Sequence, residues 1–352
     1  MTTDETLGPP SGRLVRVGRA RIVVHPRTAL VTGAVIAVAL AAAILAMTIG
    51  TMALSPVEVA RALFGGGEAA AQQVVQAVRL PRALTALFAG AALGVSGAVF
   101  QSVSRNALGS PEIIGFTTGA ATGAIAQIVL FQGDGVRIAI GALAGGVATA
   151  VVVYLLSMRG RTTGGYQLIL TGIGVGAILQ AVNEFLLVSG GIDQAVQANV
   201  WLAGSLYLRG WEHVATVGIA CAVVIPVVGA LARRATLMEM GDDVARQLGV
   251  RTERTRLALI FAAVLLAAAA TAACGPIAFV ALAAPQLISR LTGSRSMPVV
   301  GAAAMGAVLL VVADVAAQAL PFDAVVPIGR VTGVIGGLYL IWLLTRKDTV
   351  RV

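Results

Sequence analysis

Long apolar runs, separated only by short polar segments, limit what this chain of 352 residues can fold into. Hydrophobic residues make up 58% of the sequence and charged residues only 12%, about half the charged share of an average soluble domain. A membrane-crossing helix needs about 20 mostly apolar residues, and many stretches reach that length. A soluble domain of this size would need far more polar surface, so the sequence predicts an all-α integral membrane protein.

We expect about ten transmembrane helices in a compact bundle. The expected spans are 28–50, 83–103, 113–131, 137–157, 167–189, 213–232, 256–274, 277–292, 298–320 and 327–345. Gly and Ala are frequent within them, and such small residues let helices approach closely in a bilayer. Two segments between spans, 53–78 and 192–206, are expected to form short helices, the first capped by Ser55 with Pro56 at its first position.

The distribution of basic residues predicts that both termini are cytoplasmic. With the N-terminus inside, the inner segments carry nineteen of the 25 basic residues, as the positive-inside rule requires. The transmembrane domain is then 28–345, between cytoplasmic tails at 1–27 and 346–352, with a large inner loop at about 233–256. The run from Thr28 to Gly50 is longer than the apolar region of a signal peptide, so we expect it to be a permanent first span.

Several kinds of chemistry have no support in the residues. There is no GxxxxGK[ST] sequence to cradle a nucleotide phosphate, and two histidines, His25 and His213, cannot supply a credible catalytic triad. Cys221 and Cys274 both lie in apolar runs, which is typical of small buried thiols rather than of a disulfide or metal site. The arginines that give the net charge of +9 lie at the ends of apolar runs, unlike a nucleic-acid surface. We therefore expect no catalytic residue, no bound cofactor and no metal site.

Two carboxylates, Glu184 and Asp314, lie within the expected spans, towards their outer ends. Ionisable groups inside a membrane are costly, and they commonly mark ion or substrate pathways. A proton-coupled carrier would usually place such a group near mid-membrane. Both residues are open to two interpretations: structural partners of other polar groups, or direct members of a pathway.

The inner loop from Ala232 to Arg256 contains signals for short helices. Asp242 can cap one of them, with Asp243 in its first turn and Gly249 as its stop. Val244 and Leu248 are four residues apart and share one face. A short capped helix with a small apolar face suits docking to a partner, although a solvated connector with incidental caps would look similar.

Five stretches, in order, carry a resemblance to a known family. They are VRLPRALTALFAGAALGVSGAVFQSVSRNALGSPEIIGFTTGA (78–120), LILTGIGVGAILQA (168–181), NVWLAGSL (199–206), LMEMGDDVARQLGV (237–250) and GPIAFVALAAPQLISRLTG (275–293), and the tail PIGRVTGVIGGLYLIWLL (327–344) is similar too. The chain resembles the permease subunits of type II ABC importers for ferric siderophores, haem and cobalamin, the FecCD family. Within that family it is most similar to the ferric-enterobactin type.

The resemblance implies partners for this chain. Two permeases would form the pathway at their interface, two ATPase subunits would bind ATP and Mg²⁺ beneath them, and an extracytoplasmic protein would deliver the cargo. The chain itself would bind no cofactor. Similarity to the ferric-enterobactin type favours a paralogue as the second permease over an identical copy. The residues expected to dock on the ATPase are Met240, Gly241, Asp242, Asp243, Val244, Leu248 and Gly249.

The resemblance also implies roles at the two ends of the pathway. Arg79 and Arg82 match outer arginines that receive acidic residues of the binding protein, although anchoring in lipid headgroups is an alternative. Gly165 and Tyr166 begin the fifth span, which borders the cytoplasmic gate in the family. Arg330 stands where an apolar residue is usual, and it could contact an anionic cargo at the outer mouth.

The polar stretch SRNALGSPE separates the second and third spans. We expect a tight cytoplasmic turn there, held by Asn106 and Ser110, with Gly94 and Gly97 allowing close helix contact before it. The family usually has RNPLASP at this turn and often PHI where this chain has PQL, so a pH-sensitive role for Gln286 is not expected.

The chain is interpreted as a ferric-siderophore importer permease that works by alternating access. The alternatives are an ion-driven secondary carrier and a membrane anchor.

Overall fold

Ten long helices form the body of the protein, one at each predicted span. The computed structural model describes residues 13–17, 20–24, 26–50, 52–112, 114–159, 162–163, 165–294, 296–320 and 326–345, so the predicted tail 346–352 lies outside them. The helices are α1 (Pro26–Thr48), α4 (Leu80–Ser104), α5 (Phe116–Val129), α6 (Gly135–Ser157), α7 (Gly165–Ser189), α9 (Trp211–Glu239), α11 (Thr252–Cys274), α12 (Val280–Thr292), α13 (Val299–Ala319) and α14 (Ile328–Thr345). Seven are long and apolar enough to cross a membrane, and α5, α12 and α14 are shorter.

Short elements connect the long helices. They are α2 (Pro56–Leu63), α3 (Ala69–Val74), a π-helical turn (Val75–Arg79), α8 (Ile192–Leu202), α10 (Asp242–Gln247), and two hairpins, β1 (Arg13–Val17) with β2 (Ala20–Val24) and β3 (Met158–Arg159) with β4 (Thr162–Thr163). The predicted short helices are confirmed. Ser55 caps α2, where its side chain accepts from the Glu58 amide and Glu58 accepts from the Ser55 amide.

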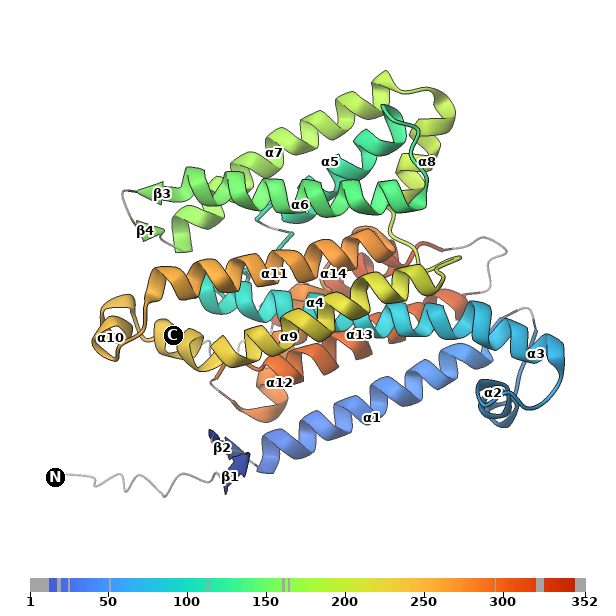
Figure 1. Cartoon of the computed structure of the whole chain (residues 1–352), viewed down its shortest axis with the longest axis horizontal. Helices are drawn as coiled ribbons and strands as arrows, with labels where there is room; N and C mark the ends of the chain where they lie inside the picture. Colours follow the sequence, from blue (N-terminus) through green and yellow to red (C-terminus); the bar gives the residue numbers. More distant parts are fainter. Residues whose placement is uncertain are drawn as a thin grey trace.

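The helices are arranged in layers around α4. Helix α4 packs against α13, α11, α9 and α12, while α5, α6 and α7 form a layer on one side and α1 lies on the other (Figure 1). Glycines allow the closest approaches: a Cβ atom at Gly94 would lie 2.1 Å from the carbonyl oxygen of Ala302, and one at Gly97 would lie 1.7 Å from that of Ala281. The predicted close helix contact at these two glycines is confirmed.

The two ends of the bundle match the predicted inner and outer segments. Figure 1 shows α10 and both hairpins at one end, and α2, α3 and α8 at the other. We call these the α10 end and the α8 end. Every predicted inner loop that has described residues lies at the α10 end. This grouping is consistent with a single cytoplasmic side. That the α10 end is the cytoplasmic one remains a prediction.

The polar stretch after α4 is more than the predicted tight turn. The turn itself covers 105–109, where Arg105 has φ of 50° and the Asn106 side chain accepts from the Leu108 amide at 2.9 Å. The chain then re-enters the bundle, with Ser110 and Ile114 buried, and α5 begins only at Phe116. Helix α5 has 14 residues and is about 21 Å long, too short to cross a hydrocarbon core of about 30 Å.

Two other connections differ from their predictions. Helix α9 continues to Glu239, so much of the predicted inner loop is helical. The seventh and eighth spans are separated by a non-helical segment, 275–279, in which Ile277 is buried, and α12 has only 13 residues. Non-helical backbone at membrane depth is tolerated where it is buried in protein or lines a cavity.

Candidate functional site

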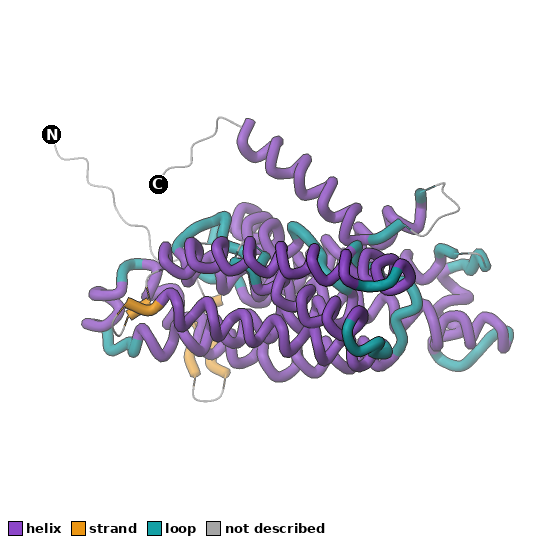
Figure 2. The backbone as a smooth tube through the Cα atoms, turned by 90° about the horizontal axis from the view of Figure 1, so that it is seen from above, coloured by secondary structure: helices purple, strands orange, loops and turns teal. Residues whose placement is uncertain are grey.

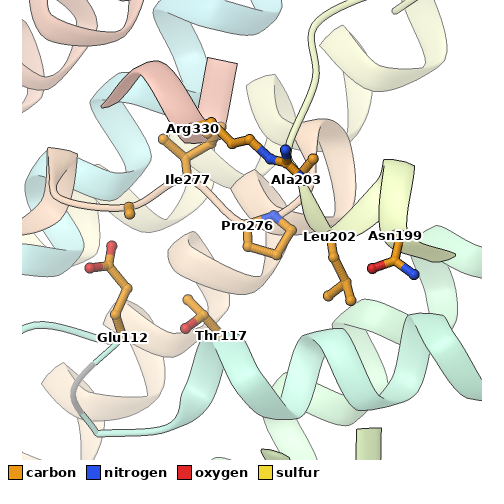
Figure 3. A pocket seen from close by; sticks show the side chains of 10 residues that line it. Glu112, Thr117, Asn199, Leu202, Ala203, Pro276, Ile277 and Arg330 are labelled. Atoms are coloured by element: carbon orange, nitrogen blue, oxygen red, sulfur yellow. The ribbon is translucent and has the colours of Figure 1, made fainter. Parts of the chain in front are cut away.

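A cavity of about 270 Å³ lies where the helix breaks meet, in the half of the bundle towards the α8 end (Figure 3). Helices α5, α12 and α14 begin around it, and α8 and α11 end there. Its lining residues are Glu112, Thr117, Asn199, Leu202, Ala203, Pro276, Ile277, Ala278, Gly329 and Arg330. Discontinuous helices whose N-termini face a cavity are the usual construction of substrate sites in transporters.

Glu112 supplies the carboxylate of this cavity. Its Oε2 atom accepts a hydrogen bond of 3.3 Å from the Phe279 amide at the start of α12. Its Oε1 atom is buried and has no hydrogen-bond partner among the described residues. Glu112 was not predicted as a site residue, because the polar stretch that contains it was expected to form a turn at the membrane edge. The one signal that could have found it is a carboxylate directly before an apolar run.

Arg330 lines the same cavity from the first turn of α14. Its side chain is exposed, and within the described part of the chain its guanidinium group has no hydrogen-bond or ion-pair partner. In Figure 3 the arginine lies across Pro276 and Ile277 from Glu112. The predicted position near an outer mouth is therefore consistent with the structure, and contact with an anionic cargo stays a prediction.

Glycines allow close backbone contacts between the helix ends around the cavity. Gly204 has φ of 68°, and a Cβ atom there would lie 2.3 Å from the carbonyl oxygen of Pro276. The Gly329 amide donates to the Gly204 carbonyl at 3.3 Å. This contact joins the segment after α8 and the start of α14 beside Pro276, so the cavity wall is built from backbone as well as from side chains.

The α10 end presents a small apolar surface. Met240, Val244 and Leu248 are 67%, 40% and 59% exposed; Val244 and Leu248 are four residues apart and share a side of α10, and Met240 lies at the end of α9 just before it. Gly241 has φ of 120°, which an L side chain rarely adopts. Gly249 has φ of 80°, and the bonds from its own amide to Arg246 and from the Val250 amide to Ala245 complete a Schellman stop, as predicted.

Asp242 does not cap α10, so that prediction is wrong. Gly241 occupies the N-cap position, and Asp242 is the first helical residue. Its carboxylate instead forms ion pairs with Arg105 after α4 and with Arg256 in α11, the latter at 2.6 Å. Asp243 is 91% exposed and pairs with Arg246 at 3.0 Å. No local pattern indicates that these distant arginines compete for Asp242.

The environment of Asp242 keeps it charged. Burial alone would raise the pKa of Asp242, but the hydrogen bonds and charges of Arg256 and Arg105 outweigh it and hold that pKa below its ordinary value. The ion pairs therefore stabilise the fold at any pH above the ordinary aspartate value. Their contribution is lost only as the pH falls through the lower folded-state pKa.

The side chains of Arg79 and Arg82 bind other groups of this chain. The Arg79 side chain is buried, and it donates to the carbonyl oxygens of Met47, at 2.6 Å, and Met52. Arg82 binds the buried carboxylate of Asp314 through Nε and Nη2, the latter at 2.7 Å. The expectation that both guanidinium groups are offered to a partner is wrong for Arg79, because the end of α1 covers it. Arg82 remains 24% exposed.

Asp314 is a structural partner, which decides between its two interpretations. It is 1% exposed, and it also accepts from Gln318 at 2.8 Å. Glu184 lies exposed on α7 and accepts from Gln180 at 3.1 Å.

Cys221 and Cys274 are free, buried thiols, as predicted.

The predicted gate residues lie at the first turn of α7. Helix α7 begins at Gly165, and Tyr166 is 76% exposed. Much of α7 is also exposed, including Leu170, Ile178 and Phe185. No described residue covers these side chains, so the gate remains a prediction.

Comparison with known proteins gives consistent matches along the chain. A family model described as the FecCD transport family matches residues 28–346. The ferric enterobactin transport system permease protein FepG of Escherichia coli (strain K12) is 44% identical over 300 residues, covering 85% of this chain and 90% of that protein. The Fe(3+)-citrate import system permease protein YfmE of Bacillus subtilis (strain 168) is 34% identical, covering 91% and 95%.

A solved structure shares the fold. It is an inward-facing metal-chelate type ABC transporter, with a TM-score of 0.79 and 27% sequence identity. The match covers 91% of this chain and 99% of that one. The helix breaks around the cavity therefore belong to an architecture that is also found in a solved transporter.

Proposed function

This chain belongs to the FecCD transport family, and from that premise we propose that it is the membrane-spanning permease subunit of an ATP-driven importer of ferric siderophores. The protein is a multi-pass membrane permease and not an enzyme. The cargo class is proposed from the relatives that carry ferric enterobactin and ferric citrate. The observation that carries the proposal is the cavity at the helix breaks, which Glu112 and Arg330 line within a bundle of mostly apolar helices.

A second permease would complete the pathway against α7 and α14. Helix α14 stands away from the body of the chain in Figure 2, and Val334, Leu338 and Ile341 on it are more than 60% exposed. A Cβ atom at Gly333 or Gly337 would meet nothing within 4 Å. Small residues on an uncovered helix face favour close packing with another helix. The cavity would then open towards the interface of two permeases, one of them this chain and the other a paralogue.

The α10 end would dock on an ATPase subunit that binds ATP and Mg²⁺. The exposed apolar surface of Met240, Val244 and Leu248 is small, as suits one helix seated in a groove. Asp242 connects that surface to Arg105, from which the chain runs directly to Glu112 in the cavity. Movement of α10 would therefore be carried to the cavity through the short segment that joins Arg105 to Glu112, as alternating access requires.

The extracytoplasmic binding protein would meet the α8 end. Of the two arginines predicted to receive it, only Arg82 reaches the surface, and its guanidinium group is already paired with Asp314. Its contribution to docking would be small, because a paired charge at the rim of an interface acts mainly on the encounter rate.

The proposed function is tested by reconstituting this chain with its candidate partners. We expect ferric-siderophore uptake into proteoliposomes that requires ATP and the binding protein, and co-purification of an ATPase in detergent. Uptake driven by a proton or sodium gradient without ATP would instead establish a secondary carrier. A chain that binds no ATPase and transports nothing would be an anchor.

Glu112→Leu is expected to lower uptake by about fivefold or more, because it leaves the Phe279 amide without an acceptor, at a cost of about 1–3 kcal/mol. Glu112→Gln keeps an acceptor and is expected to retain more activity. Uptake per amount of inserted protein measures both effects, with Glu68→Gln, an exposed carboxylate at the start of α3, as the control. Equal, wild-type uptake in the Leu and Gln variants would remove Glu112 from the pathway.

A further inference from the structure

Four exposed arginines line one groove between α9 and α11 at the α10 end. They are Arg233 and Arg234 on α9, and Arg251 and Arg254 at the start of α11. Across the residues that the structure describes, none of their guanidinium groups has an ion-pair or hydrogen-bond partner. No carboxylate is among the described residues that line the groove, so the groove is positively charged.

The groove is large, and part of its wall is apolar. It encloses about 650 Å³, and Leu231, Leu237 and Ala258 contribute to its wall. An arginine cluster that serves only solubility would not need an apolar wall beside it. The combination of positive charge and apolar wall suits a ligand that is anionic at one end and apolar at the other.

The apolar wall continues along the two helices. On α9, Val223 and Val227 are 62% and 48% exposed, and they share a face with Ala230 and Arg234 at helical spacing. On α11, Leu257 and Phe261 are 44% and 52% exposed, and they follow Arg254 on its face. An exposed apolar surface therefore runs from the groove towards the membrane interior.

The groove lies at the depth of lipid headgroups. Helix α9 has 29 residues and is about 43 Å long, whereas the hydrocarbon core is about 30 Å thick. Its last turns, which carry Arg233 and Arg234, therefore extend beyond the hydrocarbon. Basic pockets between transmembrane helices at this level are suited to lipid headgroups.

We propose that this groove binds an anionic phospholipid, with the phosphodiester between the four arginines and the acyl chains along the exposed face of α9 and α11. The inference that this lipid is in the cytoplasmic leaflet rests on the proposed function, which places the α10 end inside. Arginine suits the site because its planar guanidinium group binds phosphate oxygens in pairs. Leu248 lies both in the groove wall and on the apolar surface of α10, so the lipid would sit beside the docking surface.

The test measures binding of a fluorescent phosphatidylglycerol to the purified full chain in neutral detergent, with phosphatidylcholine as the comparison lipid. Removing two arginines, in R233Q/R234Q or in R251Q/R254Q, is expected to weaken phosphatidylglycerol binding about tenfold. The control R137Q/R290Q removes the same charge outside the groove and should leave binding unchanged. Binding by the wild type should also weaken as salt is added.

Several results would overturn the proposal. Equal binding of the two lipids, or equal loss in the control variant, would show a general charge effect. Displacement by millimolar inorganic phosphate would indicate a site for a free anion. Unchanged lipid binding, together with loss of ATPase co-purification in R233Q/R234Q, would assign the arginines to a protein interface. The assay contains neither ATP nor cargo, so its result is independent of whether the importer function holds.

Discussion

Asp314→Ala is expected to destabilise the protein by about 3–5 kcal/mol, because it leaves Arg82 without its partner between α4 and α13. The carboxylate is 1% exposed and accepts from both Arg82 and Gln318, so no other described group replaces it. Thermal unfolding of the purified chain in detergent measures the loss. A large fall in the unfolding temperature is the expected result.

Glu184→Ala provides the matched control for this prediction. Glu184 is also a carboxylate towards the outer end of a span, but it is exposed, and among the described residues its only hydrogen bond is the one that it accepts from Gln180. Its removal should change stability by less than about 1 kcal/mol. Replacing the whole pair, in R82M/D314L, should recover much of the loss, since apolar residues of similar size often substitute for a buried ion pair. Equal stability of the two alanine variants would contradict the structural role of Asp314.

Asp242→Ala is expected to lower ATP-driven uptake about tenfold while leaving the chain in the membrane. The change removes the bonds to Arg105 and Arg256 that connect α10 with the rest of the bundle. Charged hydrogen bonds contribute about 1.5–3 kcal/mol each, so losing even one of them shifts a two-state population by about tenfold or more. The ratio of cargo transported to ATP hydrolysed is the measurement that reports coupling.

Asp243, the neighbouring carboxylate, provides a control that distinguishes the loss of coupling from the loss of a charge. Asp243 is 91% exposed and pairs only with Arg246 among the described ion pairs, so Asp243→Ala should keep uptake within about twofold of wild type. Both variants remove one negative charge from the first turn of α10, and their effects on the helix dipole are similar. If both lose uptake equally, the charge of this turn matters and the connection to Arg105 does not.

Local patterns predicted the elements well, while contacts between distant residues could not be predicted. The ten apolar helices, the Ser55 cap, the Gly249 stop and the close contact at Gly94 each depend on neighbouring residues or on residue size. Arg82 and Asp314 are 232 positions apart, and Arg105 and Asp242 are 137 apart. Nothing in one sequence connects such pairs, so Asp242 was taken for a cap and Arg82 for a free cation.

Glu112 was missed for a related reason. A polar stretch between two apolar runs is usually a loop in water, and the rule gave the correct turn at 105–109. The burial of Ser110 and Ile114 accompanies the late start of α5 and the packing of Gly115 against Gly172, where a Cβ atom would lie 2.9 Å from a carbonyl oxygen. Those contacts form only in the folded bundle.

The isolation of α14 also bears on how the cell supplies this subunit. The described bundle covers little of this helix, and Val334, Leu338 and Ile341 stay exposed. An unassembled copy would therefore keep a loosely held helix, with its backbone in the low-stability range. On the proposed function, surplus copies would be open to membrane proteases until a partner arrives, which favours synthesis of the two permeases in equal amounts. Faster hydrogen exchange in α14 of the lone subunit than in the assembled transporter is the observation that would establish this.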